Sequence, residues 1–119
     1  MSKESEQFFK KMLFFLPSTL SDYEESVSHY GEVLETVIIE DIFMPEIIKL
    51  LKTEKNIELL KSIFEYFEGV SNSTDGQLVD NFSVTVLEIL GSYEELLSIA
   101  KKYMGPKTMQ LLIETMESM

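Results

Sequence analysis

Apolar residues recur along this chain at the spacing of an α-helix, not in the alternation of a half-buried β-strand. Residues 57–71 show this most clearly, since a broad apolar face there leaves one polar stripe to water. The β-branched run of residues 84–86 could suit a strand, but the apolar positions on both sides of it keep helical spacing. The whole pattern predicts helices over residues 5–16, 21–30, 32–52, 57–71, 76–90, 93–103 and 107–118.

Prolines, glycines and polar caps set the expected helix ends. Pro17 ends the first helix, because a proline moves the residue before it away from helical geometry. Gly31 suits the C-terminal cap of the second helix, and Asn56 suits the N-terminal cap of the fourth. Pro45 falls inside the third helix, where it removes a backbone donor. Pro45 must therefore kink or restart that helix, and we expect a break near Met44.

The fold class predicted by this pattern is all-α, as a single domain over residues 1–119 with about six or seven short antiparallel helices. The 119 residues are 45% hydrophobic, which is enough to bury one sizeable core. No crisp internal repeat is present, so two architectures stay open: a HEAT-like α-solenoid and an irregular helical bundle.

Charge narrows the range of partners. The chain has 21 acidic and 10 basic residues, all of the latter lysine, which gives a formal net charge of -11. Such a surface repels nucleic-acid phosphates and anionic lipid headgroups, so we expect neither as a direct partner. A basic protein is the expected counterpart, although the same charge excess also serves solubility.

Few residues could carry chemistry. The chain has no cysteine, and its only histidine, His29, shares a helical face with Glu25 and Glu32 but lacks the further ligands that zinc or a di-iron site needs. Neither a Gly-x-Ser-x-Gly elbow nor a phosphate-binding glycine loop is present. We expect no enzyme activity, no metal and no cofactor. The first fifteen residues lack the apolar length of an export signal, which favours a cytoplasmic location.

Five stretches of the sequence resemble those of one bacterial family. They are KYMGPKT at 102–108, LEIL at 87–90, PEII at 45–48, NIELL at 56–60 and IFEYFE at 63–68. Over roughly residues 32–115 the chain resembles acidic all-helical immunity proteins of polymorphic, or contact-dependent, toxin systems. The resemblance implies a HEAT-like cytosolic protein that neutralises a toxin, such as a nuclease delivered by a neighbouring cell. It implies no catalytic residue and identifies no contact residue.

Acidic residues interleaved with aromatic residues, mainly in the first half of the chain, indicate where a toxin would bind. Aromatic side chains anchor an interface and carboxylates steer a basic partner toward it, although the same aromatic residues could simply belong to the core. The candidate toxin-binding residues are Tyr23, Glu24, Glu25, His29, Glu32, Glu35, Glu40, Asp41, Glu65 and Glu68.

The sequence thus leads to one hypothesis and one alternative. The hypothesis is an immunity protein that binds the basic C-terminal toxin domain of a polymorphic toxin stoichiometrically. The alternative is an adaptor or scaffold domain that binds a peptide or a regulatory protein in a helical groove. The identity of the toxin and the oligomeric state are left open.

Overall fold

The computed structural model describes residues 1–118, and all of their regular structure is helical, which confirms the predicted all-α class. Segment η2 joins α3 to α4, and η3 joins α6 to α7. Residues 1–118 therefore form seven continuous helices. None of them has the length and apolar character needed to cross a bilayer. The elements are α1 (Lys3–Phe15), η1 (Pro17–Thr19, a 3₁₀ turn), α2 (Leu20–Tyr30), α3 (Glu35–Ile38), η2 (Ile39–Phe43, π-helical), α4 (Met44–Thr53), α5 (Ile57–Ser71), α6 (Gly76–Phe82), η3 (Ser83–Leu87, π-helical), α7 (Glu88–Ser92), α8 (Glu94–Lys101) and α9 (Pro106–Glu117).

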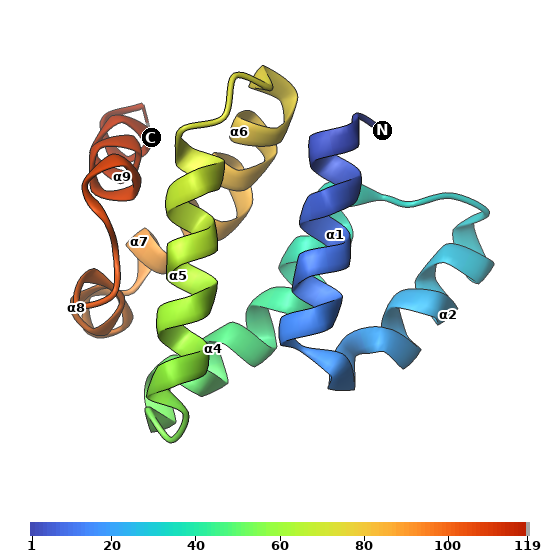
Figure 1. Cartoon of the computed structure of the whole chain (residues 1–119), viewed down its shortest axis with the longest axis horizontal. Helices are drawn as coiled ribbons and strands as arrows, with labels where there is room; N and C mark the ends of the chain where they lie inside the picture. Colours follow the sequence, from blue (N-terminus) through green and yellow to red (C-terminus); the bar gives the residue numbers. More distant parts are fainter. Residues whose placement is uncertain (119) are drawn as a thin grey trace.

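The helices pack around one hydrophobic core (Figure 1). Helices α1 and α5 run next to each other, both upright in this view. Helices α8 and α9 lie on the other side of α5 from α1 and are seen nearly along their axes. Helix α2 lies at the opposite edge of the molecule from α8 and α9.

The predicted break near Met44 is wrong. The backbone stays helical at Phe43 (φ -79°, ψ -46°) and Met44 (φ -62°, ψ -39°), so one helix runs from α3 through η2 into α4. A proline ring inside a regular α-helix clashes with the carbonyl four residues earlier. The turn before Pro45 is π-helical, and its wider winding accommodates the ring without ending the helix.

The β-branched run of residues 84–86 is helical as predicted, but it lies in the second π-helical segment, η3. Within it the buried hydroxyl of Thr85 donates a hydrogen bond to the carbonyl of Asn81. Segments η2 and η3 pack against each other, so the two widened turns meet inside the bundle. The sequence had predicted regular helix at η3, and a break at the end of η2.

Phenylalanine side chains form the centre of the core. At this centre Phe67 contacts both Phe64 and Phe82 in edge-to-face geometry, with ring centroids 5.2 and 5.1 Å apart. The fully buried phenylalanines come from α1, η2, α5 and α6, and their packing holds these elements together. They are Phe8, Phe43, Phe64, Phe67 and Phe82.

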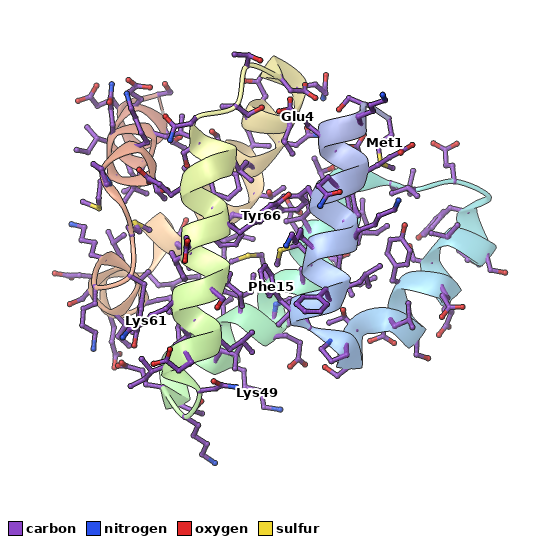
Figure 2. All side chains as sticks on the ribbon, in the orientation of Figure 1. Met1, Glu4, Phe15, Lys49, Lys61 and Tyr66 are labelled. Carbon is purple, nitrogen blue, oxygen red and sulfur yellow. The ribbon has the colours of Figure 1, made fainter. Side chains whose placement is uncertain are left out.

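Helices α1 and α5 meet through Tyr66, which points from α5 toward α1 (Figure 2). Its ring centroid lies 6.1 Å from that of Phe8 and 6.2 Å from that of Phe15. Burial, together with the negative charge of Glu4, raises the pKa of Tyr66 to about 12. Ionisation of the phenol is thus disfavoured even at pH values well above neutral.

Candidate functional site

Helix α2 carries four of the ten candidate residues and has no buried residue. It rests on α1 mainly through Tyr23, whose ring centroid lies 6.3 Å from that of Phe9. Gly31 ends the helix in a left-handed conformation (φ 73°), as predicted, and an extended segment then returns to α3 behind α1 (Figure 1). Most of the surface of α2 is consequently free to contact a partner.

The exposed face of α2 bears a shallow hollow of about 280 Å³, which we call the α2 hollow; it is lined by Asp22, Glu25, Ser26, His29 and Tyr30. Residues three and four apart on a helix share a face, which explains why these side chains converge. The rings of His29 and Tyr30 meet edge to face with centroids 4.7 Å apart, and Tyr30 is 54% exposed. Two carboxylates beside an exposed aromatic ring form a suitable receptor for an arginine or lysine side chain.

The chain segment that contains α2 carries charge of one sign. Between Lys11 and Lys49 the chain has no lysine. The acidic residues of this segment that lie outside the hollow add to the attraction that the hollow exerts on a cationic surface. The acidic residues of this stretch are Asp22, Glu24, Glu25, Glu32, Glu35, Glu40, Asp41 and Glu46.

The structure brings together only some of the candidate residues. Glu25 and His29 line the α2 hollow, with Asp22 and Tyr30, which were not among the ten candidates. Exposed Glu24 lies on the same helix, whereas Tyr23 faces α1. Helical spacing from Glu25 would have found Asp22, because the two residues are three positions apart.

The candidates after α2 lie outside the hollow. Glu32 is exposed in the segment between α2 and α3, and Glu40 and Asp41 are exposed in η2. Glu35 is half-buried, and its carboxylate accepts a hydrogen bond of 3.5 Å from the side chain of Asn81. These four residues add negative charge to the same stretch of chain but do not converge on one hollow.

The last two candidates lie on α5, which α1 separates from α2 (Figure 1). Glu65 is exposed. Glu68 caps α9: its carboxylate accepts hydrogen bonds of 2.9 Å from the backbone N–H groups of Lys107 and Thr108 and from the hydroxyl of Thr108. The N–H groups in the first turn of a helix have no partner within the helix, so a carboxylate that accepts their hydrogen bonds stabilises the helix. Glu68 is therefore occupied within the fold, and we do not count it among the residues available to a toxin.

The distinctive 102–108 stretch is held by two glutamates. Glu54 accepts hydrogen bonds from the Tyr103 hydroxyl (2.6 Å) and from the Lys102 ammonium (2.9 and 3.1 Å). A Cβ at Gly105 would lie 2.5 Å from the carboxylate of Glu68, so only glycine leaves room for the cap. The stretch thus connects α8 and α9 to the end of α4 and to α5. These contacts give its residues a structural role.

A double-mutant cycle tests this assignment. Glu68→Ala and Gly105→Ala should each lower the free energy of unfolding by about 1 kcal/mol, since either change removes the cap of α9. The double variant should lose about the same amount and not the sum, because both substitutions act on one interaction. Gly69→Ala is the control: no atom lies within 4 Å of its added Cβ, and a stabilisation of up to about 1 kcal/mol is expected. Additive losses in urea unfolding would contradict the cap.

The same cap predicts a pH dependence. Partial burial alone raises the pKa of Glu68, but the hydrogen bonds from Lys107 and Thr108 outweigh it and lower the pKa below its ordinary value of 4.5. A lowered pKa in the folded state contributes stability above pH 4.5, which is lost as the pH falls through the folded-state pKa. The stability difference between wild type and Glu68→Gln should shrink as unfolding is measured at successively lower pH. A difference that stays constant into the acid range would contradict this.

A second hollow lies on the other side of the molecule, between α4 and α8. This α4–α8 groove has a volume of about 670 Å³. Its walls are mostly apolar, with one lysine and one glutamate. The lining residues are Ile48, Lys52, Tyr93, Glu95, Leu96 and Ile99.

Within residues 1–118, no group of three or more histidine or acidic side chains is arranged to hold a metal ion. The geometry is that of an acidic helical bundle with an exposed, charged helix. The chain belongs to the family described as a domain of unknown function, DUF7674, whose model matches residues 9–118. A search of curated proteins and a search of solved structures each found no match.

Proposed function

We propose that this chain is an immunity protein that binds a basic bacterial toxin domain one to one and thereby neutralises it. The observation that carries the proposal is the α2 hollow, in which Asp22, Glu25 and Tyr30 lie together on an exposed helix. The sequence resemblance supplies the class of partner, and the charge of the lysine-free stretch supplies the sign of the partner's surface.

The physical role of each group follows from its position. An arginine or lysine side chain of the toxin enters the α2 hollow, pairs with the carboxylates of Asp22 and Glu25 and contacts the ring of Tyr30. The other carboxylates of the stretch do not need direct contact, because they act by long-range attraction during encounter. The association rate should consequently fall between about 20 and 300 mM salt, over which the Debye length shortens several-fold.

Co-expression tests the proposal. The C-terminal domain of the protein encoded immediately upstream of this chain's gene is expressed alone and together with the chain, and growth and co-purification are scored. Restored growth with a one-to-one complex would support immunity. If the domain is toxic and the chain neither restores growth nor co-purifies with it, the proposal fails for that toxin.

The adaptor alternative has one observation in its favour, the α4–α8 groove, whose apolar walls suit a short amphipathic helix. The two functions use opposite edges of the molecule (Figure 1), so they separate experimentally. Substitutions in the α2 hollow should abolish neutralisation and leave peptide binding intact, whereas substitutions in the groove should do the reverse.

A further inference from the structure

The α4–α8 groove combines an apolar floor with an exposed aromatic rim. Leu96 is 4% exposed and forms part of the floor, whereas Tyr93, just before α8, is 63% exposed. Exposed tyrosines beside an apolar hollow are typical anchors of protein interfaces. The groove therefore has the anatomy of a contact surface.

The two charged residues of the groove are free to pair with another molecule. Lys52 lies on α4, and Glu95 lies in the first turn of α8. Within residues 1–118 the ion pairs are Lys61 with Glu58 and Lys102 with Glu54. Neither Lys52 nor Glu95 belongs to one of them, so each keeps a charge available at the groove.

The groove also lies where lysines are concentrated. The ion pair between Lys102 and Glu54 (2.9 Å) joins the end of α8 to the end of α4, and Figure 2 shows Lys49 and Lys61 at this same end of the molecule. The same elements and the turn after α4 carry Glu46, Glu54, Glu58, Glu65, Glu94 and Glu95, so the charges of this end nearly balance. A chain of net charge -11 repels its own copies, and a nearly balanced end repels a second copy less than the acidic remainder does. The lysines of this end are Lys49, Lys52, Lys55, Lys61, Lys101 and Lys102.

We propose that the occupant of the α4–α8 groove is the same groove of a second copy, in a two-fold symmetric dimer. A two-fold axis brings the same patch of both copies together, so a surface with one lysine and one glutamate on opposite walls complements itself. Lys52 of each copy pairs with Glu95 of the other, and the exposed rings of Tyr93 fill the hollow next to the axis. Helix α2 lies at the opposite edge (Figure 1), so both α2 hollows stay open in the dimer, and the proposal stands independently of the proposed function.

Analytical ultracentrifugation of the full chain over a range of concentrations tests the dimer. We expect a reversible monomer–dimer equilibrium. Lys52→Glu should raise the dissociation constant about tenfold or more, because it turns two attractive pairs into two repulsive ones. The swapped variant Lys52→Glu/Glu95→Lys should restore dimerisation, since each pair is re-formed with its charges exchanged. Tyr93→Ser should weaken the dimer without lowering the melting temperature of the monomer, measured at concentrations below the dissociation constant, because the ring is mostly exposed.

Lys49→Glu is the matched control, since it makes the same change in net charge on the same helix outside the groove. It should weaken the dimer much less than Lys52→Glu does. A chain that remains monomeric at every concentration would overturn the proposal. So would a dimer that the charge swap fails to restore, or one that Lys49→Glu weakens as much as Lys52→Glu does. Circular dichroism on each variant separates loss of the dimer from loss of folding.

Discussion

Replacing Phe67 with alanine is expected to lower the free energy of unfolding by about 3–5 kcal/mol. Phe67 is fully buried and contacts the rings of Phe64 and Phe82, so its removal loses both apolar burial and two aromatic contacts. The surrounding helices cannot collapse fully into the space, because the close-packed side chains of the core relax only in part. Urea unfolding followed by circular dichroism measures the loss, and a wild type with about 5 kcal/mol of stability would leave the variant only about 0–2 kcal/mol, so that its unfolding begins at low urea.

Phe14→Ala provides the control for this prediction. It removes the same side chain from α1, but Phe14 is 75% exposed, so the free energy of unfolding should change by no more than about 0.5 kcal/mol. Similar losses in the two variants would show that Phe67 does not lie at the centre of the core.

Reversing two charges in the α2 hollow should raise the dissociation constant of the toxin complex by about 100-fold. In the variant Asp22→Lys/Glu25→Lys, two carboxylates that would pair with a cationic side chain become two repelling ammonium groups. Both residues are exposed, so the fold should be retained. Binding kinetics at several salt concentrations are the measurement, and the loss should include a slower association with a weaker salt dependence.

Glu114→Lys/Glu117→Lys is the matched control. It makes the same change in net charge on α9, at the opposite edge of the molecule (Figure 1). Retained affinity in this control together with loss in the α2 variant would assign binding to the hollow. Equal losses would mean that only total charge matters, and the specific role of α2 would be wrong.

Helix positions were predictable because they depend on local signals. Asn56 caps α5 through its side chain, which accepts a hydrogen bond from the backbone of Leu59, and Gly31 ends α2 in the left-handed conformation. The Gly105–Pro106 pair begins α9 as its N-cap and first residue. Each of these effects operates within a few residues, so the sequence is sufficient to identify it.

The two π-helical segments were not predictable in the same way. Pro45 signals a disturbance, but whether the helix breaks or widens depends on what packs against it, and here η2 packs against η3. Segment η3 contains no proline or glycine that would signal a widened turn. Its winding follows from packing inside the bundle, which periodicity in the sequence does not report.

Local chemistry by itself determined the all-α class, most helix ends, the acidic charge and the clustering of carboxylates near residues 22–41, because these depend on residue type and on spacing within a helical turn. Only the tertiary structure decided which carboxylates are free to bind. Glu25 and Glu68 look alike in sequence, since both are acidic residues on predicted helices. The fold leaves Glu25 in an open hollow and places Glu68 against the start of α9, forty residues away in the chain from Thr108. Contacts across such a distance depend on how the helices pack together, and no local pattern encodes them.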